Sequence, residues 1–156
     1  MRPLHLLCLA LTLPCLASAT AQAAPETPSL RARVHRLLSA RHGLPDPAHF
    51  AALGPEGRQL LLELGADPKA NPWQRGRALM ALSQAPGPEV ALLYRDVLAE
   101  AQAPLGLRRQ VVILYARTFP ETARNVLLPL TSNAEPELRR VVQVNLQRLD
   151  AAARPE

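Results

Sequence analysis

Arginine is the residue type in this chain whose spacing most strongly suggests chemistry. Arg77, Arg108 and Arg139 recur at equal intervals along the chain, and each has a second arginine nearby. The second arginines are Arg75, Arg109 and Arg140. A guanidinium group presents its N–H donors in a planar fork that matches a carboxylate or a phosphate. A row of such groups therefore indicates either a structural ladder of ion pairs or a site for anions.

The two alternatives differ in which side chains remain free. In the structural alternative, Arg77, Arg108 and Arg139 form an arginine ladder, in which each crosses a turn and binds an acidic group or a carbonyl oxygen of a neighbouring unit. The candidate acidic partners are Asp67, Glu100 and Glu135. In the functional alternative, guanidinium groups face a partner or an anion. We favour the ladder for the first set, and the candidate contact residues are then Trp73, Arg75, Arg109 and Arg140.

The remaining polar residues do not form a pattern typical of catalysis or metal binding. His35, His42 and His49 lack the tight spacing of zinc ligands. The sequence contains no Gly-x-Ser-x-Gly, P-loop or Gly-x-Gly-x-x-Gly motif. We therefore expect no catalytic, cofactor-binding or metal-binding residues, and a protein that is not an enzyme.

Residues 1–23 have the pattern of a secretory signal peptide. The basic Arg2 is followed by the apolar run Leu4–Leu13, and Ala21-Gln22-Ala23 matches a cleavage site. The apolar run is shorter than the ~20 residues that a membrane-spanning helix needs. We expect cleavage after Ala23 and a periplasmic or secreted chain with no stable membrane span.

Both cysteines lie inside this leader, at Cys8 and Cys15. A lipoprotein is the weaker alternative, because Leu7 and Pro14 stand where a small residue would precede the modified cysteine. With cleavage after Ala23, the mature chain would contain no cysteine and no disulfide. Its stability would have to come from packing.

The elements that position the arginines follow from a repeated pattern. Pro55, Pro88 and Pro120 are each followed by glutamate and should begin helices, because proline fits the first turn and glutamate meets the positive end of the helix dipole. After each pair come an apolar segment, a turn and a second helix that carries the arginines. A regular repeat of this length, with two helices in each copy, is typical of an α-solenoid. The predicted repeats are 55–84, 88–118 and 120–149, within a repeat region of 55–151.

The segments that flank the repeats are predicted to cap them. The spacing of Leu30, Val34 and Leu38 predicts an amphipathic helix over 29–42 that ends at Gly43. A short helix should run from Asp46-Pro47 to Gly54. We expect residues 29–54 to form N-terminal capping helices. A linker of residues 24–28, with Thr27 as the helix cap, precedes them, and residues 152–156 form a C-terminal tail.

The third unit resembles a HEAT repeat of the kind also found in phycobilisome-lyase-type proteins. The resemblance rests on Leu127-Leu128-Pro129-Leu130, a polar turn over 131–134, and Glu135-Pro136-Glu137-Leu138-Arg139-Arg140. It implies an exported bacterial member of that family. The implied fold is all-α, a short right-handed α-α superhelix of about three helical hairpins with an N-terminal capping helix. Pro129 should bend its helix. Val142 departs from the family pattern, in which alanine is usual.

Two functions of different classes fit these features. The first is a non-enzymatic protein–protein interaction module or scaffold that presents the ridge of its second helices to a protein or peptide partner. The alternative is an anion-binding module whose repeated arginines hold polyanionic envelope material or nucleic acid. The formal net charge of +5 is compatible with either function. We expect a protein partner first and do not expect nucleic acid.

Overall fold

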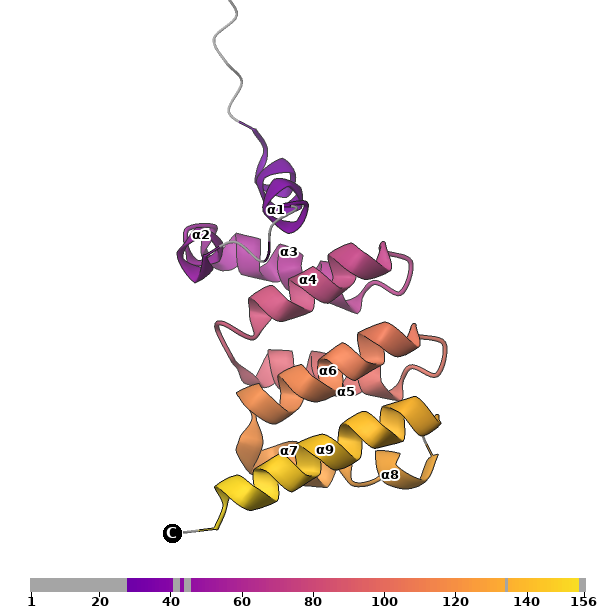
Figure 1. The fold of residues 1–156 in the computed structure, drawn as a ribbon. Coiled ribbons are helices and arrows are strands. Elements are labelled where there is room, and N and C mark those ends of the chain that lie inside the picture. The colour runs from indigo at the N-terminus through magenta and orange to yellow at the C-terminus, as the bar shows by residue number, and fades with distance from the viewer. Residues whose placement is uncertain (1–27, 41–42, 44–45, 134, 155–156) are drawn as a thin grey trace, which may run out of the picture.

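The computed structural model describes residues 28–40, 43, 46–133 and 135–154, and within them the fold is all-α, as predicted (Figure 1). The predicted leader 1–23 and residues 24–27 of the linker lie outside the described residues. The helices of the described part are α1 (Leu30–Leu38), α2 (Pro47–Ala51), α3 (Gly54–Ala66), α4 (Pro72–Leu82), α5 (Pro88–Ala99), α6 (Leu105–Thr118), α7 (Pro120–Leu127), α8 (Leu130–Asn133) and α9 (Pro136–Ala152).

Successive helices pack in pairs, and the pairs stack in chain order. The pairs are α3 with α4, α5 with α6, and α7 and α8 with α9. Figure 1 shows α4, α6 and α9 side by side in one layer, with α3, α5 and α7 behind them. At the N-terminal end, α1 packs on α3 and α4, while α2 packs on α3. Helices α1 and α2 therefore cover the first pair.

Helix starts follow the local sequence signals. Proline occupies the first turn of α3, α4, α5, α7 and α9. An N–H group at this position would have no hydrogen-bond partner within the helix, so its absence from proline costs nothing. Asn71 caps α4, because its Oδ1 accepts a hydrogen bond from the Trp73 N–H at 2.9 Å. Ser29 caps α1 by accepting from the Ala32 N–H at 3.3 Å. Thr27, the predicted cap, lies outside the described residues.

Two predicted helix ends are wrong. Helix α1 ends at Leu38 and not near Gly43, because its apolar stripe of Leu30, Val34 and Leu38 stops there. Pro129 interrupts its helix instead of bending it: α7 ends at Leu127 and the separate turn α8 follows. Proline removes a backbone donor and its ring crowds the carbonyl four residues earlier. The predicted polar turn from Thr131 is therefore helical as far as Asn133.

One continuous apolar cluster runs through the stack. Its largest buried side chains include Tyr94 of α5 and Tyr115 of α6, whose ring centroids lie 6.3 Å apart. Phe119 lies 6.1 Å from Tyr94 and 5.3 Å from Tyr115. Burial raises the pKa of the Tyr94 phenol, so its hydroxyl stays protonated and donates to the Leu79 carbonyl oxygen at 2.7 Å. These three rings pack together where the α5–α6 pair meets the start of α7.

An ion pair between Arg58 of α3 and Glu89 of α5 should make the free energy of unfolding depend on pH in the acid range. Hydrogen bonds from Arg58 lower the pKa of the Glu89 carboxyl. A carboxylate with a lowered pKa stabilises the fold above its unfolded value of about 4.3, and this contribution is lost as pH falls through the folded pKa. The variant Glu89→Gln should therefore melt at a lower temperature than wild type at pH 7, and the difference should vanish once pH falls below the folded pKa of Glu89.

The matched control for this thermal-unfolding series is Glu121→Gln. Glu121 holds the equivalent place in the first turn of α7, and it makes no ion pair within the described residues. Its variant should lose only the small helix-dipole contribution, so at pH 7 its melting temperature should lie much closer to wild type than that of Glu89→Gln. An equal pH dependence in the two variants would show that the Arg58 contact is not the cause.

Candidate functional site

The position of an arginine within its helix decides what that arginine contacts. Arg75, Arg108 and Arg139 are each the fourth residue of their helix, in α4, α6 and α9. They are therefore the equivalent residues of the three units. The prediction that grouped Arg77 with Arg108 and Arg139 used the wrong register. It assumed an even spacing of the second helices, but the interval between the starts of α4 and α6 is longer than the interval between the starts of α6 and α9.

Arg75 is buried and fully occupied, so the prediction that it remains free is wrong. Its side chain is 3% exposed. The Nε donates to the Gly65 carbonyl oxygen at 2.8 Å, and Nη2 donates to Glu100 Oε2 at 2.6 Å. Gly65 lies in the last turn of α3, where carbonyl groups lack helical partners and a cation faces the negative end of the dipole. Arg75 thus caps one helix and bridges to the next pair.

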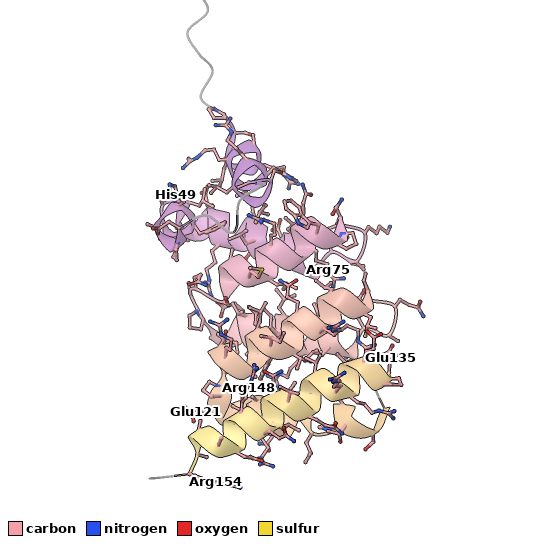
Figure 2. All side chains as sticks on the ribbon, viewed as in Figure 1. His49, Arg75, Glu121, Glu135, Arg148 and Arg154 are labelled. Carbon is pink, nitrogen blue, oxygen red and sulfur yellow. The ribbon has the colours of Figure 1, made fainter. Side chains whose placement is uncertain are left out.

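Arg108 makes the corresponding ion pair between the second and third helix pairs. It is buried, and Nη1 donates to both carboxylate oxygens of Glu135 at 2.9 and 3.0 Å. Figure 2 shows Arg75 and Glu135 at the same edge of the stack, where the second helices begin. Two of the three predicted acidic partners, Glu100 and Glu135, therefore bind arginine. The third, Asp67, instead accepts a hydrogen bond from the Lys69 N–H at 2.8 Å.

Arg77 connects the first pair to the N-terminal segment. Its Nη2 donates to the Gly43 carbonyl oxygen, and its Cζ lies 4.7 Å from the centre of the Trp73 ring. A cation at that distance from an indole is attracted by the negative face of the ring. Arg77 is therefore structural, although its partners are a carbonyl and an aromatic ring. Trp73 stays 51% exposed.

Arg109 and Arg140 are exposed and line one groove between α6 and α9. Arg148 supplies a third cation to the same groove, farther along α9 (Figure 2). The volume of the groove is about 430 Å³. We call this surface the α6–α9 groove, and it is lined by Arg109, Ile113, Glu137, Arg140, Val141, Val144, Asn145 and Arg148.

The cations of the α6–α9 groove are only weakly neutralised by the protein itself. Arg109 Nη1 donates to Glu137 Oε2 at 3.3 Å, and the two side chains are 47% and 66% exposed. Pairs this exposed contribute little to stability. Within the described residues, Arg140 and Arg148 make no side-chain hydrogen bond and no ion pair. The groove therefore carries three arginines against one glutamate.

Apolar side chains lie among these cations. Ile113 is 38% exposed and Val144 is 39% exposed. On α9, Arg140, Val144 and Arg148 follow one another at steps of four residues, which places them on one helix face. Arg109 and Ile113 repeat the same step on α6.

The sequence reasoning identified Arg109 and Arg140 but missed Ile113, Val144 and Arg148. Ile113 and Val144 lie among other apolar residues in the sequence, which is typical of core positions. The step of four between Arg140, Val144 and Arg148 is the signal that was available. Arg139, predicted for the ladder, is half-buried and makes no ion pair within the described residues.

A second hollow of about 360 Å³ lies between α2, α3 and the end of α4. Phe50, Leu61 and Leu82 are among its apolar lining residues, and its one charged residue, Arg58, is already bound to Glu89. In the described part of the chain, no three potential metal ligands cluster. None of the described helices combines the length and the apolar character needed to cross a membrane. The α6–α9 groove is the candidate functional site because three exposed arginines gather in it.

Comparison of the chain with protein-family models, with curated proteins and with solved structures finds no match in any of the three.

Proposed function

We propose that this chain is an exported, non-enzymatic helical-repeat protein that binds a protein or peptide partner through the ridge of its second helices, α4, α6 and α9. The observation that carries the proposal is the exposure of Ile113 and Val144 inside a groove rimmed by arginines. Apolar side chains in contact with water are unfavourable, and a partner that covers them removes that cost. A polar rim around an apolar centre is also the usual composition of a protein interface.

The fold proposal that accompanies this function is a short right-handed α-α superhelix of the HEAT-like kind. Its support is the equivalence of two contacts: Arg75 with Glu100, and Arg108 with Glu135, join successive helix pairs from the same helix position. Stacks of such pairs offer elongated binding surfaces. Export, with cleavage after Ala23 and a periplasmic or secreted destination, is proposed from the sequence pattern of residues 1–23.

A site-specific photocrosslinking experiment tests the proposed function. A photoreactive amino acid replaces Ile113 in the full-length chain in its native host, and the matched control replaces Leu92. Leu92 is 54% exposed on α5, in the other layer of helices. We expect a discrete crosslinked protein from position 113 and none from position 92. The same products from both positions, or none from 113, would contradict the proposal.

The captured protein must then bind in purified form. Val144→Glu places a carboxylate in the apolar centre of the α6–α9 groove without disturbing the buried face of α9, because Val144 is 39% exposed. We expect binding of the purified partner to weaken at least tenfold, about 1.4 kcal/mol. Leu92→Glu should leave the affinity unchanged.

The alternative function is binding of polyanionic envelope material. The burial of Arg75 removes one of its predicted contacts, but the groove arginines Arg109, Arg140 and Arg148 support it. Titration with heparin at low salt separates it from the first proposal. Heparin binding that is lost when these three arginines become alanine would support the alternative, and no binding at low salt would exclude it.

A further inference from the structure

We infer that the occupant of the α6–α9 groove is an acidic segment of a partner protein, in which an apolar residue lies between two carboxylates. The apolar residue would contact Ile113 and Val144, and the carboxylates would pair with Arg140 and Arg148. This inference rests on the proposed function and specifies the chemistry of its partner.

Charge is the first argument for an acidic segment. Arg75 and Arg108 are already neutralised by carboxylates of the chain itself. Arg140 and Arg148 have no such partner within the described residues, and Arg109 has only the 3.3 Å contact with exposed Glu137. Three of the exposed arginines on the ridge therefore gather in this groove, whereas Arg117 of α6 lies outside it. Complementary charge on the partner favours the encounter and disfavours basic competitors.

Spacing is the second argument. Arg140 and Arg148 are two steps of four apart on α9, which separates them by about 12 Å at a rise of about 1.5 Å per residue. Val144 lies midway between them on the same face, and Ile113 faces the same groove from α6. The groove thus offers a cation, an apolar surface and a second cation in a line.

The apolar centre decides between a peptide and a bare polyanion. A polyphosphate or a sulfated sugar can pair with the guanidinium groups, but it has no side chain with which to cover Ile113 and Val144. A peptide segment satisfies both kinds of group at once. Peptides that carry an apolar side chain between acidic side chains on one face are therefore the class that the groove fits best.

Selection from a library of random twelve-residue peptides on the purified full chain tests this inference. We expect the enriched peptides to carry Asp or Glu on both sides of an aliphatic or aromatic residue. A labelled enriched peptide should bind the double variant Arg140→Gln/Arg148→Gln about tenfold more weakly than wild type. Binding should also weaken as salt rises from about 0.05 to about 0.5 M, because screening acts on exposed charges.

The control for charge alone is Arg95→Gln, which removes an exposed arginine from α5 in the other layer. Its affinity for the peptide should stay within twofold of wild type. Enriched peptides without acidic residues, no enrichment, or equal binding to the double variant would overturn the inference. Heparin bound more tightly than any enriched peptide would also overturn it and assign the groove to a polyanion.

The photocrosslinking experiment keeps this inference separate from the proposed function. Crosslinking at position 113 reports contact whatever the charge of the partner. A neutral or basic crosslinked segment would preserve the proposed function and overturn the acidic partner. Acidic peptides that bind the groove, without any crosslinked protein in the host, would support the acidic chemistry of the occupant and contradict the proposed function.

Discussion

Replacing Arg75 with methionine should lower the free energy of unfolding by about 3 kcal/mol. Methionine keeps most of the apolar volume of the arginine stem but removes the guanidinium group. The carboxylate of Glu100 then loses its partner in a site that is only 27% exposed, and the Gly65 carbonyl oxygen loses its Nε–H donor. A partly buried charge and a helix-end carbonyl are both left unpaired, and each loss is destabilising.

The control is Arg109→Met, which breaks the pair with Glu137. Both side chains of that pair are about half-exposed or more, so its loss should cost less than about 1 kcal/mol. Urea denaturation followed by circular dichroism measures both variants. Equal losses would show that Arg75 does not hold the first and second helix pairs together.

The helix starts could be predicted because their signals are local. A proline in the first turn and a neighbouring capping or acidic residue act on the backbone within one turn. Pro88 and Pro120 begin helices where the sequence places them. The end of α1 and the break at Pro129 were harder, because each depends on whether packing compensates for an unfavourable local contact.

The partners of the arginines could be predicted only as a class. Glu100 and Glu135 were correctly identified as acids that bind arginine, but which arginine each binds depends on the turn lengths that set the helix register. The turn before α4 places Arg75, and not Arg77, at the fourth helical position. Burial of Arg75 against Gly65 and Glu100 arises from three segments and cannot be inferred from any one of them.

The candidate site also contains residues that could be predicted from the sequence and residues that could not. Arg109 and Arg140 could be identified from their exposed positions beside the ladder, but the apolar part of the groove could not. Ile113 lies among four consecutive apolar residues, 111–114, in α6, and such a run does not indicate which member faces outward. Only the packing of α6 against α9 leaves Ile113 and Val144 partly exposed.

Tyr94→Ala should be the most destabilising single truncation among the aromatic residues, with a loss of about 4 kcal/mol in the free energy of unfolding. Tyr94 has no exposed surface. Its ring contacts Tyr115 and Phe119, and its hydroxyl reaches Leu79 in the preceding helix pair. Truncation opens a cavity between the pairs, removes the aromatic contacts and breaks one buried hydrogen bond.

Two further variants separate these causes in the same urea titration. Tyr94→Phe keeps the ring and removes only the hydroxyl, so it should cost about 1 kcal/mol. Leu92→Ala changes a 54% exposed residue two positions away on α5 and should stay within about 0.5 kcal/mol of wild type. If Tyr94→Phe were as destabilising as Tyr94→Ala, the hydrogen bond to Leu79 would dominate. If Tyr94→Ala cost no more than Leu92→Ala, the aromatic residues could not be what joins the helix pairs, because a buried contact between cooperative units cannot be removed without loss of stability.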